Sequence, residues 1–222
     1  MFSSIHRGIV RFMPSGLDPD AIIISADVHI LDIEPKISRS LELPVAMNFA
    51  EFHEVLQAAF GWTDSHLHHF NVGGLIIGAP EFGEDGFLDR RTFEATEVRL
   101  QDLVFPFDDD ATLTIHYEYD FGDSWRHRIV MRRLPAQAGI KYPRCVVGSR
   151  AAPPEDVGGP SGYTAFLEAW HDPEHESHKI IRSWAGKKFD PERFNLNASN
   201  KAIRKAIRVS GGDYRFRQLT PR

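Results

Sequence analysis

Cysteine, long apolar stretches and the common nucleotide-binding motifs are scarce or missing in this sequence of 222 residues. The single cysteine, Cys145, excludes an intrachain disulfide and any zinc cluster made of several thiolates. Apolar runs last only a few residues, far short of the roughly 20 that cross a bilayer, so we expect a cytoplasmic protein with no membrane partner. The motifs GxGxxG, GxxxxGK[ST] and GxSxG are absent, which gives no support for a phosphate-binding loop or a serine nucleophile elbow.

The composition is that of a globular protein with an uneven charge distribution. Hydrophobic residues make up 42% of the chain and 16 residues are phenylalanine, enough for a substantial core. The net charge is −5, but residues 201–222 alone carry +6, which leaves −11 for residues 1–200. An acidic body argues against broad binding to nucleic acid. Any nucleic-acid contact is therefore expected at the basic C-terminus, through Lys201, Arg204, Lys205, Arg208, Arg215 and Arg217.

Hydrophobic periodicity predicts the elements of the first half of the chain. Residues 21–31 alternate as a strand does, and residues 37–43 are a plausible antiparallel partner. Asn48 with Glu51 three residues later predicts a capped helix that ends at Gly61. We expect a further short strand at 66–72, followed by a long glycine-rich connection over 73–91.

The second half is expected to contain one hairpin and several helices. Two β-rich runs, 112–121 and 125–134, predict a hairpin with a tip of about three residues. Gly and Pro predict a loop over 148–162, and helices are expected from Tyr163 to Trp170, from Asp172 toward Gly186, and over the amphipathic run at 201–208. The predicted organisation is an N-terminal extension (1–20), a single α+β domain with a mainly antiparallel sheet and packed helices (21–200), and a basic C-terminal helix and tail (201–222).

Histidines and carboxylates near the predicted strand ends are the first candidates for chemistry. His66 and His68 would share one face of a strand, from which two imidazoles can converge on one ion. Alternatively, they hydrogen-bond backbone or carboxylate groups. The carboxylates of the hairpin tip can hold a cation or accept hydrogen bonds from turn amides, and the second role needs no ligand. The ligand-binding candidates are His66, His68, Asp120, Asp123, Trp125, His127 and Arg150, and the candidates for a divalent metal are His66, His68, Asp123 and His127.

Other reactive residue types carry weaker signals. Cys145 is expected to be a buried, inert thiol, because a nucleophile would need an adjacent base and a lowered pKa. Glu155 and Asp156, in the predicted loop, are the candidates for a catalytic base. The string at 175–178, HESH, is one residue shorter than the zinc-protease pattern HExxH, so a protease is disfavoured.

Several longer motifs resemble one protein family. They are YEYDFGDSW at 117–125, LHHF at 67–70, YPRCVVGSRAAPPEDVGGPSGY at 142–163 and FDPERF at 189–194. The sequence is similar over roughly residues 21–200 to the plasmid ORF-three-like family, pRiA-type proteins also met as accessory products of insertion sequences. The resemblance implies an α+β domain with a mainly antiparallel sheet, and it implies no established reaction.

Two functional hypotheses follow from these residues. The first is a noncatalytic domain that binds a small ligand or a protein partner, as an accessory factor of mobile DNA, because the motifs contain no complete catalytic set. The alternative is a metal-assisted hydrolase in which His66, His68, Asp123 and His127 hold a cation beside Glu155 or Asp156 as the base. Under either hypothesis, we expect the segments 66–70, 120–127 and 145–156 to meet in one surface cleft.

Overall fold

The strands of the protein form a single sheet in a computed structural model that describes residues 19–78, 92–104 and 111–209. The strand order is β5-β4-β3-β6-β7-β1-β2-β8, and every neighbouring pair is antiparallel except β4 and β5. This arrangement confirms the expected α+β fold with a mainly antiparallel sheet. The strands are β1 (Ile22–Ile30), β2 (Ser38–Pro44), β3 (His68–Val72), β4 (Leu75–Gly78), β5 (Thr92–Glu94), β6 (Leu113–Tyr119), β7 (Trp125–Pro135) and β8 (Arg144–Ser149).

The central strands follow directly from the alternation of apolar side chains. β1 pairs with β2 on one side and with β7 on the other, so it is flanked on both sides from Ile23 to His29. Its side chains Ile24, Ala26 and Val28 are fully buried. The predicted strand at 21–31 and its antiparallel partner at 37–43 are therefore confirmed.

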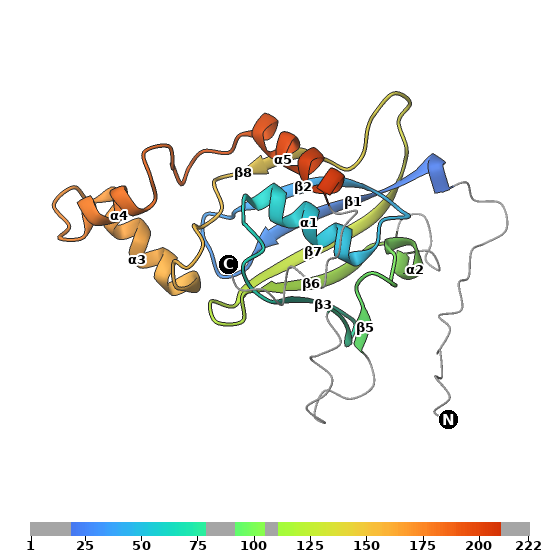
Figure 1. The fold of residues 1–222 in the computed structure, drawn as a ribbon, viewed down its shortest axis with the longest axis horizontal. Helices are drawn as coiled ribbons and strands as arrows, with labels where there is room; N and C mark the ends of the chain where they lie inside the picture. The colour runs from blue at the N-terminus through green and yellow to red at the C-terminus, as the bar shows by residue number, and fades with distance from the viewer. Residues whose placement is uncertain (1–18, 79–91, 105–110, 210–222) are drawn as a thin grey trace.

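Helix α1 (Phe49–Phe60) covers the sheet (Figure 1). Its aromatic side chains are buried in the core. The Asn48 side chain accepts the Glu51 N–H, and the Glu51 carboxylate accepts the Asn48 N–H, which is the reciprocal capping box expected from the sequence. The helix ends at Gly61, whose φ of 81° is the left-handed conformation of a C-cap glycine. Phe49 of α1 packs edge-on against Phe70 of β3, with ring centroids 4.9 Å apart.

The remaining helices are α2 (Leu100–Val104), α3 (Gly159–His171), α4 (His178–Trp184) and α5 (Leu196–Val209). α5 packs against α1 and β8, whereas α3 and α4 pack together at one end of the molecule (Figure 1). The expected domain boundary at residue 200 falls inside α5. Among the described residues, no helix combines the length and the apolar content needed to cross a membrane.

Several element ends differ from those predicted. The β6–β7 tip has five residues rather than three, because β6 stops at Tyr119. α3 begins at Gly159, four residues before the expected start. Asp172 does not begin the next helix: it ends α3, and its carboxylate accepts the Glu174 N–H in a local turn. β4, β5, β8 and α2 were not predicted, and residues 79–91 of the expected long connection lie outside the described residues.

Candidate functional site

The five-residue turn between β6 and β7 is organised by Asp120. Its Oδ1 atom accepts the N–H groups of Gly122 and Asp123, at 3.0 and 3.2 Å. The Asp123 carboxylate instead accepts the N–H of Gly158, at 3.0 Å, and so ties the turn to the start of α3. The residue that satisfies the turn amides is therefore Asp120, and Asp123 joins two segments that are distant in the sequence.

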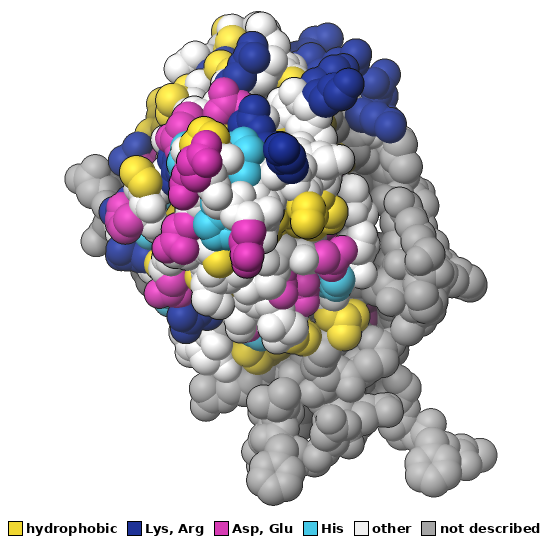
Figure 2. All heavy atoms as spheres, turned by 90° about the vertical axis from the view of Figure 1, so that its left-hand side faces the viewer, with side chains coloured by type: hydrophobic (Ala, Val, Ile, Leu, Met, Phe, Trp, Pro, Cys, Tyr) yellow, Lys and Arg dark blue, Asp and Glu magenta, His cyan; other side chains and the backbone are white. Residues whose placement is uncertain are grey.

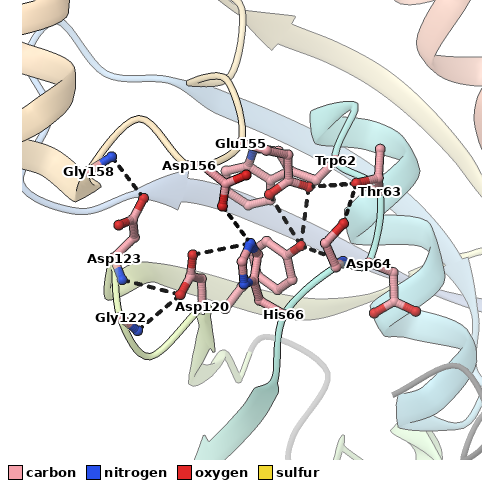
Figure 3. Close-up of polar contacts among 12 residues, drawn as sticks. Trp62, Thr63, Asp64, His66, Asp120, Gly122, Asp123, Glu155, Asp156 and Gly158 are labelled. Atoms are coloured by element: carbon pink, nitrogen blue, oxygen red, sulfur yellow. Dashed lines mark hydrogen bonds and ion pairs between the residues drawn. The ribbon is translucent and has the colours of Figure 1, made fainter. Parts of the chain in front are cut away.

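His66 lies between two carboxylates from the other two segments (Figure 3). Its Nε2 atom is 3.0 Å from Asp156 Oδ1 and 3.5 Å from Asp120 Oδ2. One ligand atom from each of the three residues lies within 4.8 Å of the others. Asp120 is buried and Asp156 is exposed, so the group opens to solvent on one side. We refer to His66, Asp120 and Asp156 as the outer cluster.

Glu155 fixes the loop that carries the outer cluster. Its Oε1 atom accepts both the N–H and the hydroxyl of Thr63, at 2.8 and 3.2 Å. The Tyr119 hydroxyl donates to the same carboxylate and accepts the Ser65 N–H. Burial, followed by the negative charge of Glu155, raises the pKa of Tyr119 well above its ordinary value, so this hydroxyl remains a donor. The Tyr119 ring stacks on Trp62 at 5.1 Å.

Unusual backbone geometry gathers in the same region. Asp64, Asp120 and Asp156 have φ values of 55°, 58° and 59°, and Ser124 has 55°. Aspartate is among the few residues besides glycine that adopt this left-handed conformation readily. Uncommon backbone conformations persist where surrounding contacts hold them, and they are frequent at functional sites.

A second group of ionisable side chains contains two residues that the sequence analysis missed, His53 and Asp64. His53 of α1, Asp64 and His68 of β3 bring ligand atoms within 4.8 Å of one another, and we refer to them as the inner cluster. His53 is fully buried beside the apolar residues Phe52 and Leu56 of α1. A histidine on the apolar face of a predicted helix was a readable signal, whereas nothing in the local sequence pointed to Asp64.

The metal set proposed from the sequence is not assembled as expected. β3 begins at His68, so His66 lies in the preceding loop and the two histidines share no strand face. His68 is buried and stacks on His53. His127 is buried among aromatic rings, and burial lowers its pKa to about 4. Trp125, another ligand candidate, is also a core residue.

Two other candidates have partners elsewhere in the fold. The Arg150 guanidinium pairs with Glu192 and donates to the carbonyl oxygen of Pro35. The Cys145 thiol is buried, and burial raises its pKa, as an inert thiol requires. Among the proposed nucleic-acid residues, the four on α5 are exposed: Lys201, Arg204, Lys205 and Arg208. Arg215 and Arg217 lie outside the described residues.

Comparisons with known proteins agree with this fold and its motifs. Residues 23–198 match a family model described as "Plasmid pRiA4b ORF-3-like protein". The chain is 36% identical over 186 residues to the uncharacterized protein y4hQ of Sinorhizobium fredii (strain NBRC 101917 / NGR234), covering 82% of this chain and 91% of the relative. It also resembles the crystal structure of MM3350, a protein of unknown function from Methanosarcina mazei Go1, with a TM-score of 0.69, 33% identity, and coverage of 80% of this chain and 97% of that one. The chain belongs to the plasmid pRiA4b ORF-3-like family.

Proposed function

We propose that the protein is a binding domain whose ligand is a divalent cation held by the outer cluster. The observation that carries this proposal is the spacing of the donor atoms, at 3.0 and 3.5 Å from His66 Nε2 to the two carboxylates. Two ligands about 2.1 Å from one ion lie about 3.0 Å apart at right angles and about 3.4 Å apart at the tetrahedral angle. These two distances therefore match the spacing of ligands around one ion.

Hydrogen bonds hold the side chains of the outer cluster in place before any ion binds, which favours a binding role. The Asp120 Oδ1 atom is occupied by two turn amides, so Oδ2 faces His66 in a fixed orientation. The Glu155 carboxylate lies next to the group, and Figure 2 shows Asp, Glu and His side chains interspersed with Lys and Arg on the end of the molecule that carries α3 and α4. Negative charge around an opening attracts cations and raises their local concentration.

The contacts of Glu155 favour binding over hydrolysis. A general base must reach the proton of an attacking water. Both oxygens of Glu155 already accept hydrogen bonds from Thr63 or Tyr119. Asp156, the other candidate base, faces His66 and acts as a ligand under this proposal. We therefore place binding of the cation ahead of the hydrolase hypothesis.

The experiment is a calorimetric titration of the chelator-treated full chain with Mn²⁺. We expect Asp156→Asn and Asp120→Asn each to weaken binding at least roughly tenfold, since each variant replaces a charged ligand with a neutral amide. Glu97→Gln, which neutralises an exposed carboxylate outside the outer cluster, is the matched control and should bind as the wild type does. Equal affinity of all four proteins, or no heat of binding in the wild type, would show that the three residues form only an ion-pair network.

A second role is favoured by the exposed basic residues of α5. The family description names a plasmid, and α5 presents Lys201, Arg204, Lys205 and Arg208 to solvent. We propose that the protein serves a mobile element as an accessory factor that contacts nucleic acid through this helix. The salt dependence of DNA binding tests this role separately from cation binding.

A further inference from the structure

The inner cluster joins three parts of the fold and is more deeply buried than the outer cluster. His53 comes from α1, Asp64 from the loop after it and His68 from β3. The two histidines are fully buried, and the side chain of Asp64 is 10% exposed. Figure 3 shows the Asp64 carboxylate turned away from His66 and Asp156, so the two clusters use different donor atoms.

A ring of hydrogen bonds fixes the orientation of His53. The backbone N–H of Asp64 can only donate, and it donates to Gln57 Oε1 at 2.8 Å. The Gln57 amide nitrogen therefore donates to the Tyr117 hydroxyl at 3.1 Å. That hydroxyl lies 2.9 Å from His53 Nδ1, and His53 Nε2 lies 2.8 Å from Asp64 Oδ1. Four contacts thus hold the imidazole and the carboxylate in one geometry.

The second oxygen of Asp64 has no partner within the described part of the chain. Asp64 Oδ2 is buried and, among the described residues, accepts no hydrogen bond. A buried carboxylate is normally balanced by a cationic side chain or by a metal ion. The ion pair recorded for Asp64 is with His53, and no lysine or arginine is paired with it in the described part of the chain. An unsatisfied atom of this kind calls for a water molecule or an ion beside it.

We propose that His53, Asp64 and His68 bind a first-row transition-metal ion of the Zn²⁺ type. Two imidazoles and one carboxylate form the three-ligand set of many zinc sites, and imidazole nitrogen favours Zn²⁺ over Mg²⁺ or Ca²⁺. Once Nε2 faces the metal, the N–H at His53 Nδ1 can donate a hydrogen bond to the Tyr117 hydroxyl, which is the usual outer support of a ligating histidine.

Metal binding at the inner cluster requires one rearrangement. The His53 and His68 rings are stacked, with centroids 3.4 Å apart and planes within 4°. An ion bound in the plane of one imidazole lies outside the plane of the other, so His68 must turn for both to reach the same ion. The proposal therefore includes loss of the ring stack when the ion is bound.

The experiment measures Zn²⁺ bound to the full chain after chelator treatment, by equilibrium dialysis and elemental analysis. Asp156→Asn is the background, because it removes a charged ligand of the outer cluster, and this variant should keep one tightly bound equivalent of Zn²⁺. Adding Asp64→Asn should abolish that equivalent, while adding the exposed Glu97→Gln should not. Asparagine keeps the oxygen that faces His53 and tolerates the left-handed backbone, so the fold is expected to survive.

A crystal of the wild-type protein grown with Zn²⁺ gives a readout that needs no variant. We expect an anomalous peak bonded to His53, Asp64 and His68, with the two rings no longer parallel. A water molecule on Asp64 Oδ2 without an anomalous peak would overturn the proposal, as would full Zn²⁺ binding by the double variant. Since Mn²⁺ binding at the outer cluster is measured independently, failure of one site is distinguishable from failure of the other.

Discussion

Asp120 combines a structural role and a ligand role in one side chain, and the two can be separated. Replacement by alanine removes both hydrogen bonds to the turn and places a Cβ-bearing apolar residue at a φ of 58°. We expect Asp120→Ala to lower the free energy of unfolding by about 2 kcal/mol. Asp120→Asn keeps the oxygen that accepts these hydrogen bonds, so it should change the free energy of unfolding by less than about 0.5 kcal/mol while it weakens Mn²⁺ binding. Urea unfolding of both variants measures the difference, and equal destabilisation would contradict this separation.

The buried residue His127 makes the free energy of unfolding depend on pH. Its Nδ1 atom faces the Trp125 carbonyl oxygen, and its buried Nε2 has no partner among the described residues. Burial, with a smaller contribution from the positive charge of His29, lowers its pKa from the ordinary 6.5 to about 4. The unfolded chain therefore takes up a proton below pH 6.5 that the folded protein takes up only near pH 4. The contribution of His127 to the free energy of unfolding is fully present above pH 6.5, and it declines as the pH falls toward 4.

The measurement is urea unfolding at pH 7.5 and pH 5 for the wild type and for His127→Leu. This histidine should account for roughly 2 kcal/mol of the stability that the wild type loses between the two pH values. The leucine variant lacks the titrating group, so it should lose less over the same interval, whatever its stability at pH 7.5. An identical loss in both proteins would assign the pH dependence to other groups.

At the scale of elements, the junction between α3 and the β6–β7 turn depends on a glycine. Gly159 has a φ of 69°, and a Cβ atom at this position would lie 2.4 Å from the Asp123 carbonyl oxygen. Gly159→Ala should therefore separate α3 from the turn and cost about 3 kcal/mol in unfolding free energy. Gly139→Ala, with a φ of 79° and open space around it, should cost only about 1 kcal/mol. A similar loss of unfolding free energy at both positions would show that the loss comes from the left-handed backbone alone and not from the contact with Asp123.

Elements with local signals were predictable, and those defined by distant partners were not. The ends of α1 follow from Asn48, Glu51 and Gly61, all within one short segment. β8 gave no such signal, because its alternation is weak and it forms by pairing with β2, about a hundred residues earlier. The start of α3 was missed because Gly158 and Gly159 resemble loop residues in sequence, although here they allow close contact with the turn.

The candidate site shows the same limit. Sequence position placed His66, Asp120 and Asp156 in segments expected to meet, and the structure brings them together. The sequence alone could not show that the His68 and His127 side chains point into the core. The strand register and the residue at which β3 begins decide which way each side chain faces. The contacts of His53 with Asp64 and His68 form only because α1 packs over β3, so the inner cluster became visible only in the structure.

At the scale of the whole molecule, opposite charges occupy different elements. The outer cluster and Glu155 lie where the loop after α1, the β6–β7 turn and the loop before α3 meet, whereas α5 carries exposed lysine and arginine side chains. This division allows a cation and a polyanion to bind without competing for one surface. Binding of nucleic acid should therefore be unaffected by Asp156→Asn.

The affinity for nucleic acid should reside in α5 and fall steeply with salt, because each phosphate contact releases counterions. With the four basic residues of α5 contributing, the slope of log K against log salt for duplex DNA should be about −3.6, and its magnitude should shrink by about 1 for each residue replaced by glutamine. Fluorescence anisotropy with a labelled duplex at several salt concentrations measures the slope. Replacement of the exposed Lys187 and Lys188, outside α5, is the control and should leave the slope unchanged. If a variant with glutamine at all four α5 positions bound as tightly as the wild type, or if salt had no effect, α5 would be a solvated helix face and the accessory role on nucleic acid would fail.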